Sequence, residues 1–265
     1  MNNKVPAVIC AAGYGKVHDQ ARSKLMDPLF GVPVLERVIR NVKQAGMFFP
    51  IITVVNPLLG EEIIDQLMEA GHGDVWFAYQ SQRRGAANAV YCALPALRQL
   101  RAPWFLAMFG EMPNLQPETL VALYRAHLES PETDISFLLT PFESGHTLAP
   151  QLGKYAHLRT GWDSGQRQTD YLRIYSEYSA CDGDDILGSV YCLRTEWFAQ
   201  MYHQIPAMYK SDKFGQEYHL PWLVKLAVDG NAKYLPLRLP VHQQVLGINT
   251  INDHRLMETV LGGGS

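Results

Sequence analysis

The chain has 265 residues, of which 47% are hydrophobic and 18% charged, a balance that supports a buried globular core and argues against disorder. Its formal net charge of −3 gives no electrostatic case for a protein that binds nucleic acid or docks on an acidic membrane surface. A small anionic ligand needs only local positive charge and stays possible.

Targeting signals and cysteines indicate the compartment. The N-terminal stretch MNNKVPAVICAAG lacks the long apolar segment of a signal peptide, and no window approaches a membrane span, so we expect a soluble cytoplasmic protein. The four cysteines show no metal-like or CxxC spacing, and those in apolar runs (Cys10 and Cys192) are interpreted as buried free thiols. The terminal GGGS (262–265) is interpreted as a linker remnant.

The first half of the chain alternates short apolar runs with helical periodicity. Strands are predicted at 7–12, 51–56, 75–80, 104–110 and 134–140, and helices at 33–46, 60–73, 85–100 and 117–130. Strands that alternate with helices in this way predict right-handed βαβ units and a mostly parallel, Rossmann-like sheet flanked by helices. Ligands of such sheets gather at the carboxyl ends of the strands.

The residue composition changes after Gly153. Residues 154–198 are richer in polar and aromatic side chains and indicate short strands and turns. A helix is predicted at 217–230, strands at 232–240 and 242–249, and a last helix from Asp253. We expect one domain over 1–261, with a nucleotide-binding half (1–150), a substrate-binding half (151–261) and a β insertion on the substrate side after the fifth strand.

A glycine-containing loop follows the first strand in AVICAAGYGKVHDQARSKL (7–25). Glycines at that point let backbone N–H groups approach a phosphate closely. The loop is neither a dinucleotide fingerprint nor a P-loop. By itself it is therefore equally typical of an ordinary tight turn.

Further motifs follow this loop in a specific order: SKLMDPLFGVPVLERVI, QSQRRGAANAV, FGEMPNL, QEYHLPWLVKLAVDG and LGINTINDHRLME. Together they resemble the sugar-1-phosphate nucleotidyltransferases, and most closely the uridylyltransferase domain of bacterial N-acetylglucosamine-1-phosphate uridyltransferase. The resemblance covers nearly the whole chain. It implies the nucleotide-diphospho-sugar transferase fold, which is similar to GT-A.

The resemblance also implies a reaction. A sugar-1-phosphate oxygen attacks the α-phosphorus of a UTP-like nucleoside triphosphate, a nucleoside monophosphate is transferred, and pyrophosphate leaves. Catalysis of this kind depends on positioning and charge neutralisation, with Mg²⁺ as the cofactor. The implied partners are a nucleoside triphosphate and a sugar phosphate or related small phosphate, with no nucleic acid and no membrane.

The resemblance assigns nucleotide binding to a set of positions. Backbone contacts to base and ribose are expected at the end of the first strand, Gln80 matches the glutamine that reads the pyrimidine edge, and Gly85 lies beside the base. Ala86 replaces a threonine that contributes to base recognition. The complete expected set is Ala11, Ala12, Gly13, Gln80, Gly85 and Ala86.

The expected catalytic cations are Lys24, Lys16 and Arg22. Lys24 matches the lysine that family members place on the phosphates. Val17 stands where the family has an arginine that stabilises the departing pyrophosphate, and loss of such a cation can slow phosphoryl transfer by orders of magnitude. Lys16 and Arg22 could reach inward to compensate, or could be solvated loop charges.

Glu111 and Asn249 match the aspartate and asparagine that hold Mg²⁺ in the family. Both supply oxygen ligands, which Mg²⁺ prefers. Glutamate keeps the charge but adds a methylene, and because Mg²⁺ tolerates little distortion this change could move or weaken the metal. The alternative is that Glu111 caps a turn.

The sugar pocket departs further from the family. Ala156 stands at a family glycine, Glu177 or Ser176 at a glutamate depending on register, and Leu187 at an asparagine. The usual polar set for an N-acetylhexosamine is largely absent, so a sugar phosphate that binds here is expected to be a different one or to sit differently. Ala156 and Glu177 are the expected sugar-side positions.

Two other classes of function compete with this enzyme. The departures at Val17, Glu111 and Leu187 favour a catalytically impaired relative that binds nucleotides or sugar nucleotides in a binding or regulatory role. The residues that favour an enzyme are Lys24, Gln80, Gly13 and Asn249. A glycosyltransferase is disfavoured because the D-x-D pattern in DGDD (182–185) precedes the ILGSVYC strand instead of following the fourth strand. A polar turn is expected at DGDD. The histidines show no paired spacing typical of zinc ligands.

Overall fold

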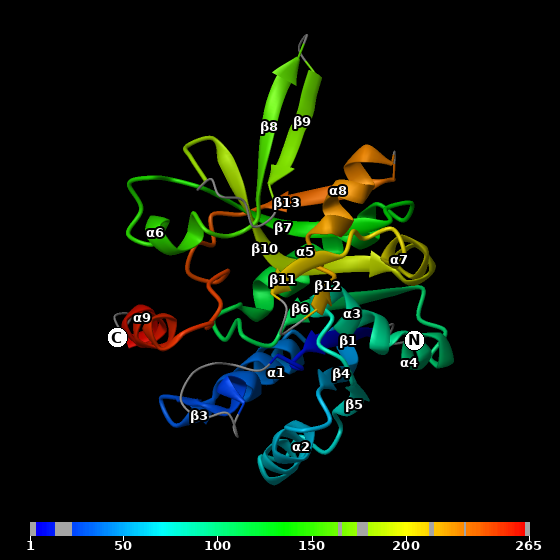
Figure 1. Ribbon diagram of the computed structural model, residues 1–265, viewed down its shortest axis with the longest axis vertical. Coiled ribbons are helices and arrows are strands. Elements are labelled where there is room, and N and C mark those ends of the chain that lie inside the picture. The colour runs from blue at the N-terminus through cyan, green and yellow to red at the C-terminus, as the bar shows by residue number, and fades with distance from the viewer. Residues whose placement is uncertain are drawn as a thin grey trace.

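One mixed sheet organises the molecule in the computed structural model, which describes residues 4–13, 23–163, 166–173, 180–211, 215–230 and 232–262. The strand order is β13-β7-β10-β6-β1-β4-β5, with β8 and β9 continuing from β10 (Figure 1). The strands are β1 (Val5–Cys10), β4 (Phe48–Val55), β5 (Trp76–Tyr79), β6 (Trp104–Phe109), β7 (Ile135–Pro141), β8 (His157–Asp163), β9 (Gln166–Arg173), β10 (Asp184–Arg194) and β13 (Tyr234–Arg238).

The strand directions decide where loops gather. β1 pairs in parallel with both β4 and β6, β4 with β5, and β13 with β7. β10 lies antiparallel between β6 and β7 and is therefore the reversed strand of the main sheet. The carboxyl ends of β1, β4, β5 and β6 consequently share one edge, which is where parallel sheets of this kind bind ligands.

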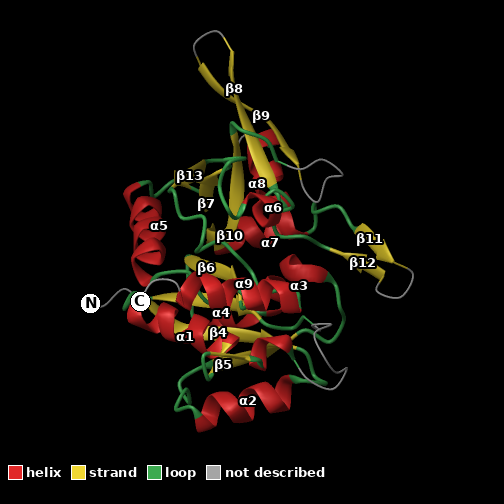
Figure 2. Cartoon of the chain, turned by 90° about the vertical axis from the view of Figure 1, so that its left-hand side faces the viewer, coloured by secondary structure: helices red, strands yellow, loops and turns green. Residues whose placement is uncertain are grey.

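Helices cover both faces of the sheet (Figure 2). One core cluster contains α1 (Val34–Gln44), α2 (Gly60–Glu69), α5 (Pro117–Glu129) and α9 (Ile251–Gly262). The opposite cluster contains α3 (Gly85–Cys92), α4 (Leu94–Gln99), α7 (Thr195–Tyr202) and α8 (Trp222–Asp229). Strand β1 serves both clusters, because Ala7 and Ile9 face the first and Val8 faces the second, as the two-residue period of a strand requires.

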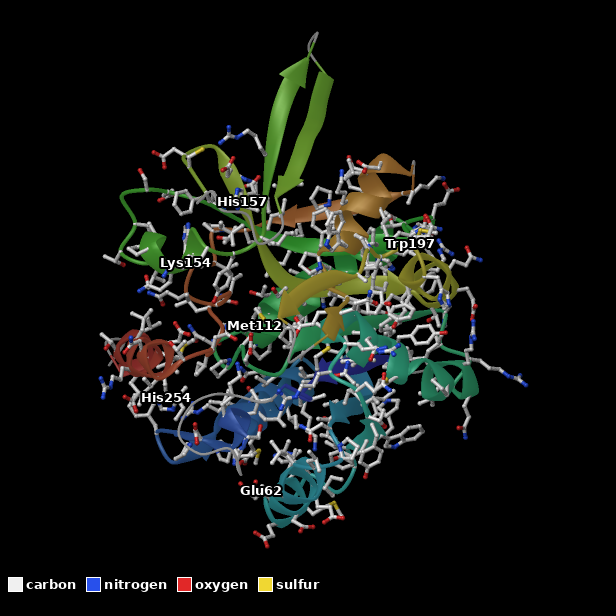
Figure 3. The ribbon with its side chains drawn as sticks, in the orientation of Figure 1. Glu62, Met112, Lys154, His157, Trp197 and His254 are labelled. Carbon is white, nitrogen blue, oxygen red and sulfur yellow. The ribbon has the colours of Figure 1, made fainter. Side chains whose placement is uncertain are left out.

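Short elements complete the fold. These are the one-turn helix η1 (Lys24–Met26), the hairpin β2 (Pro28–Leu29) and β3 (Val32–Pro33), the helix α6 (Ala149–Leu152) and the hairpin β11 (Met208–Ser211) and β12 (Gly215–Glu217). The β8–β9 hairpin projects away from the body of the molecule (Figure 1). His254 of α9 hydrogen-bonds to the carbonyl of Pro28 at 3.1 Å, which holds the last helix beside the β2–β3 hairpin (Figure 3).

Local sequence explains the helix boundaries. α1 buries an i, i+4 stripe, namely Val34, Leu35, Val38, Ile39 and Val42. The predicted helix at 85–100 is two helices that meet at Ala93, because Pro95 cannot continue the hydrogen bonding of α3. α9 begins with a capping box, in which the backbone N–H of Asp253 donates to Thr250 Oγ1 and the backbone N–H of Thr250 donates to Asp253 Oδ2.

The five strands predicted in the first half are confirmed by β1, β4, β5, β6 and β7, and the strand predicted at 232–240 by β13. The strand predicted at 242–249 is wrong, because that segment is irregular. Its amides bond to loops instead of a neighbouring strand: Ile248 N–H donates to Glu111 O at 2.9 Å and Gly247 N–H to Tyr155 Oη at 2.9 Å. Helix α7 was missed inside the region interpreted as strands and turns.

Candidate active site

Three predicted site residues from distant parts of the sequence converge. Lys24 Nζ lies 2.5 Å from Glu111 Oε2 and 2.9 Å from Asn249 Oδ1. The Lys24 side chain is 9% exposed and that of Glu111 20%, so this ion pair is largely withdrawn from solvent. The ammonium group is thus held between a carboxylate oxygen and an amide oxygen, the two oxygen types that also suit Mg²⁺.

Each of the three side chains is placed by its local backbone. Ser23 is fully buried and caps η1 by accepting from Leu25 N–H, which sets Lys24 at the first position of that turn. Glu111 follows Gly110 at the carboxyl end of β6. Asn249 lies just before the capping box of α9, and its backbone N–H donates to Asp253 Oδ2 at 3.0 Å.

Gly247 keeps open the space beside Lys24, Glu111 and Asn249, which are called the triad below. A Cβ at that position would lie 3.2 Å from Glu111 Oε1 and 3.5 Å from Asn249 Nδ2. The loop that carries Gly247 is held by Tyr155, whose hydroxyl accepts from Gly247 N–H at 2.9 Å. Met112, the residue after Glu111, is buried near the middle of the molecule (Figure 3). The triad therefore lies at the carboxyl end of β6, beside the loop that precedes α9.

The end of β1 is held by its neighbours. Ala11 N–H donates to Val54 O at 2.8 Å, and Asn56 Nδ2 donates to Ala12 O at 3.3 Å. Ala11 and Ala12 are buried, whereas Gly13 is exposed and a Cβ there would meet nothing within 4 Å. Asn56 also accepts from the amides of the loop after β4, so one buried asparagine joins two strand ends.

The turn from β5 into α3 holds the predicted base-reading residues. Gln80 N–H bonds to Val55 O, and Gln80 Nε2 donates to Gly85 O at 3.0 Å and to Asn88 Oδ1 at 2.9 Å. Gly85 has φ +79°, and a Cβ there would lie 2.6 Å from Tyr218 O. Only glycine fits this close approach without strain.

Cys10 borders the same turn. Its Sγ lies 3.7 Å from Ala86 O, and burial, reinforced by the nearby charge of Glu111, raises the pKa of Cys10 to about 12. The thiol stays protonated at neutral pH and acts as a donor, not a nucleophile. The prediction of free thiols holds for Cys10 and Cys192. Cys192 is buried as expected, whereas Cys10 is only partly buried.

The acidic DGDD segment is a turn that leads into β10, as predicted. Burial alone would raise the pKa of Asp184, but hydrogen bonds from Arg159 Nε at 2.6 Å and from Cys181 hold it below the usual value. Asp185 pairs with Arg238 Nε at 2.7 Å. Asp184 and Asp185 are thus counter-ions of two arginines, whereas Asp182 accepts hydrogen bonds from the Ser144 amide and hydroxyl.

The sequence matches the MobA-like NTP transferase domain over residues 7–174. The chain belongs to this family. Bifunctional protein GlmU of Geotalea uraniireducens is 29% identical over 253 residues, which cover 93% of this chain and 50% of the relative. GlmU of Symbiobacterium thermophilum is 34% identical over 127 residues, 48% of this chain and 26% of the relative. The chain spans about half the length of the first of these relatives.

Solved structures confirm the predicted fold class of this MobA-like domain. CMP:2-keto-3-deoxy-manno-octonic acid synthetase complexed with CTP aligns with a TM-score of 0.68 at 13% identity, covering 99% of this chain and 100% of that one. 4-Diphosphocytidyl-2C-methyl-D-erythritol synthase from Anaerococcus prevotii aligns with a TM-score of 0.66 at 16% identity and the same coverage. The resemblance to sugar-1-phosphate nucleotidyltransferases predicted from the motifs is therefore confirmed.

Several predicted positions of the MobA-like domain lie elsewhere or outside the described residues. Ala156 and Leu187 are buried and joined by a 2.9 Å hydrogen bond from Leu187 N–H to Ala156 O, and both side chains belong to the same hydrophobic core cluster. Lys16, Val17, Arg22, Ser176 and Glu177 lie outside the described residues. The roles assigned to all these positions stay predictions.

Sequence reasoning missed Asn56, Asn88 and Tyr155, which shape the site through hydrogen bonds. Asn56 carried a usable signal, because a polar residue directly after an apolar parallel strand lies at the ligand-binding edge. Asn88 and Tyr155 carried none, since their partners are set by packing between elements.

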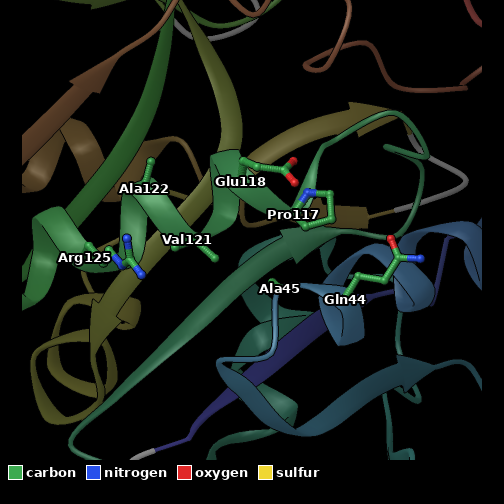
Figure 4. Close-up of a pocket in the computed structure, with 7 residues that line it drawn as sticks. All are labelled: Gln44, Ala45, Pro117, Glu118, Val121, Ala122 and Arg125. Atoms are coloured by element: carbon green, nitrogen blue, oxygen red, sulfur yellow. The ribbon is translucent and has the colours of Figure 1, made fainter.

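Two surface hollows in the described part of the chain are lined by residues other than the triad. One, of about 290 Å³, lies between the end of α1 and α5 and is lined by Gln44, Ala45, Pro117, Glu118, Val121, Ala122 and Arg125 (Figure 4). A second, of about 580 Å³, is lined by Tyr79, Tyr91, Cys92, Leu94, Pro95 and Arg98. Within that same described part, no helix is long and apolar enough to cross a membrane.

Proposed function

We propose that this chain transfers a nucleoside monophosphate from a UTP-like nucleoside triphosphate to a sugar-1-phosphate or similar small phosphate and releases pyrophosphate. The observation that carries the proposal is the convergence of Lys24 with Glu111 and Asn249, which lie 87 and 225 residues after it in the sequence. A structural ion pair needs no third polar partner of this kind. A phosphoryl-transfer site needs a mobile cation beside an oxygen pair that can hold another cation.

The donor set fits Mg²⁺. Glu111 and Asn249 supply a carboxylate and an amide oxygen, and the Lys24 ammonium between them is a stand-in cation. Among the described residues no cluster of three or more His, Cys, Asp or Glu side chains could hold a metal, so phosphate oxygens and water would complete the shell. When bound, Mg²⁺ would supply neutralisation of the phosphate charge.

The chain's own residues have distinct tasks in this proposal. Lys24 leaves Glu111 and binds the triphosphate, because an anionic ligand competes with the carboxylate for the ammonium. The backbone after β1 receives the nucleotide at the edge where Ala11 and Ala12 are already fixed. The phosphate oxygen of the acceptor is positioned in line with the α-phosphorus, and the bond to pyrophosphate breaks as the new P–O bond forms.

The test is pyrophosphate release with each common nucleoside triphosphate and a panel of sugar-1-phosphates, with and without Mg²⁺. We expect Mg²⁺-dependent release with one pairing and a loss of at least about 10²-fold in Lys24→Met, since Lys24 is a positioned cation on the reacting phosphates. Lys225→Met is the matched control, because Lys225 pairs with Asp229 on the surface of α8.

The same assay separates the proposal from its alternative. Thermal stabilisation by a nucleotide without turnover on any acceptor would favour the catalytically impaired binding relative. If no nucleotide stabilises the chain and no pairing gives turnover, both hypotheses are contradicted.

A further inference from the structure

Three consecutive backbone amides in the irregular segment before α9 donate to three different elements. The amide of Asn249 donates into the capping box of α9, and that of Ile248 donates to Glu111 O at 2.9 Å, just after β6. The amide of Gly247 donates to Tyr155 Oη at 2.9 Å. Because this segment belongs to no helix or strand, such contacts determine where its backbone lies. Of the three, the Gly247 contact is the one that reaches the turn before β8.

The position of the Tyr155 hydroxyl is set independently of the segment that it holds. Its ring packs against the first core cluster, and its amide donates to Leu152 O at 3.0 Å. Its carbonyl lies 3.0 Å from His157 Nδ1, which must carry the hydrogen because a carbonyl can only accept. The carbonyl of Ala156, the next residue, accepts from Leu187 N–H of β10 at 2.9 Å. Tyr155 is thus tied to α6, β8 and β10.

Gly247 lies directly against the carboxylate expected to bind metal. A Cβ at Gly247 would lie 3.2 Å from Glu111 Oε1 and 3.5 Å from Asn249 Nδ2. Lys24 is bonded to the other carboxylate oxygen, Oε2, so Oε1 is the oxygen on the Gly247 side. A displacement of Gly247 toward Glu111 would fill this space with backbone. A displacement away from it would carry Asn249 along, since only one residue separates the two.

We propose that Tyr155 is a positioning residue for the cation site: its hydroxyl holds Gly247 at the distance that leaves room for a divalent metal beside Glu111. This inference rests on the proposed function, in which Glu111 and Asn249 hold Mg²⁺. Mg²⁺ tolerates little distortion of its ligand geometry, and groups that orient its ligands without touching the metal affect its affinity. Tyr155 acts through one neutral hydrogen bond to the backbone, which contributes a factor of about 3 to 10 to an equilibrium constant.

The first experiment measures Mn²⁺ binding by electron paramagnetic resonance of free Mn²⁺, without nucleotide. Mn²⁺ accepts the same oxygen ligands as Mg²⁺. Lys24→Met is the starting protein, because the Lys24 ammonium occupies Glu111 in the wild-type chain. Adding Tyr155→Phe to Lys24→Met should weaken Mn²⁺ binding by at least about threefold. Phenylalanine keeps the ring that packs on the core, and urea unfolding checks that both proteins are folded.

The second experiment keeps Lys24 and follows pyrophosphate release with the nucleoside triphosphate and sugar-1-phosphate that pair in the wild-type chain. Tyr155→Phe should raise the free Mg²⁺ concentration for half-maximal rate by at least about threefold. Excess Mg²⁺ should then restore the rate to within about twofold of wild type, because the lost hydrogen bond affects metal binding and not the reacting groups. A general loosening of the fold would not be corrected by metal.

Tyr234→Phe is the matched control for both experiments. Tyr234 lies on β13, is 36% exposed, and stacks on Phe137 with ring centroids 6.3 Å apart. Phenylalanine keeps this stacking and removes a hydroxyl that belongs to a different part of the sheet. Neither Mn²⁺ binding nor the Mg²⁺ requirement should change.

The outcomes separate this inference from the proposed function. If Tyr155→Phe leaves Mn²⁺ affinity unchanged, prevents folding, or acts no differently from Tyr234→Phe, the positioning role is overturned and the proposed function stands. If Mn²⁺ binding weakens as expected but the wild-type chain releases no pyrophosphate with any pairing, the positioning role stands and the proposed transfer is overturned. If Lys24→Met binds no Mn²⁺, the metal site and the positioning role are both overturned.

Discussion

Lys24 Nζ lies 2.5 Å from Glu111 Oε2, so the lysine expected to bind phosphate neutralises the carboxylate expected to bind metal. The pair is largely buried, and each charge would be poorly solvated without the other. We therefore expect Lys24 and a divalent metal to compete for Glu111 until an anionic ligand draws the lysine away.

Replacing Lys24 with methionine should expose this competition. In the absence of nucleotide, Lys24→Met is expected to bind Mn²⁺ at least about tenfold more tightly than wild type, which corresponds to about 1.4 kcal/mol. The readout is the free Mn²⁺ signal in electron paramagnetic resonance. Glu111→Gln should lose the site, and Lys225→Met should behave as wild type. Equal affinity in Lys24→Met and wild type would contradict the competition.

Gly85→Ala should disturb both fold and nucleotide site. The backbone there has φ +79° and the new Cβ would meet Tyr218 O at 2.6 Å, so we expect a loss of about 2–4 kcal/mol in the free energy of unfolding. Gly71→Ala is the matched control, because Gly71 has φ +83° with nothing within 4 Å of a Cβ. Urea unfolding of both variants isolates the contact, and equal losses would show that backbone strain alone matters.

Acid should destabilise the fold through His127 of α5. Burial, helped by Arg194, lowers the pKa of His127 to about 4, and the neutral ring contacts Ser136 Oγ at 2.7 Å. Between pH 4 and the unfolded value near 6.5 the unfolded chain binds the extra proton, so stability falls as the pH is lowered through this window.

The size of that effect can be measured by urea unfolding at pH 7.5 and pH 4.5. His127→Gln removes the titrating group and should reduce the acid-induced loss of unfolding free energy by about 2 kcal/mol. If the two proteins lose stability equally over this range, His127 does not carry the effect.

Asp184→Ala should be strongly destabilising although the residue lies outside the triad. Asp184 is 2% exposed and satisfies Arg159 and the Cys181 amide. Because the Arg159 side chain is 38% exposed, the expected loss of about 2–4 kcal/mol in unfolding free energy lies below that of a fully buried pair. Asp229→Ala, which removes the surface pair with Lys225, should change the same free energy by less than about 1 kcal/mol.

The sequence predicted the elements that local patterns determine, and the prediction failed where contacts between distant segments determine the structure. The periodicity of α1 and the apolar runs of β1 and β6 are local properties, and local patterns predicted those elements and their parallel arrangement. The segment at 242–249 misled the prediction, because its apolar residues pack and bond against loops from distant parts of the chain. A β-like pattern cannot show which neighbour receives its hydrogen bonds.

The sequence by itself determined the family, the fold class and the identity of the residues in the triad, because ordered motifs and strand–helix alternation are written along the chain. Only the tertiary structure decided that Lys24 closes on Glu111 and Asn249, and that the Gln80 amide donates to Gly85 O and Asn88 Oδ1. These are relationships between side chains carried by different elements. Their geometry follows from how β1, β5 and β6 share an edge and how α7 packs on α3, which no single segment specifies.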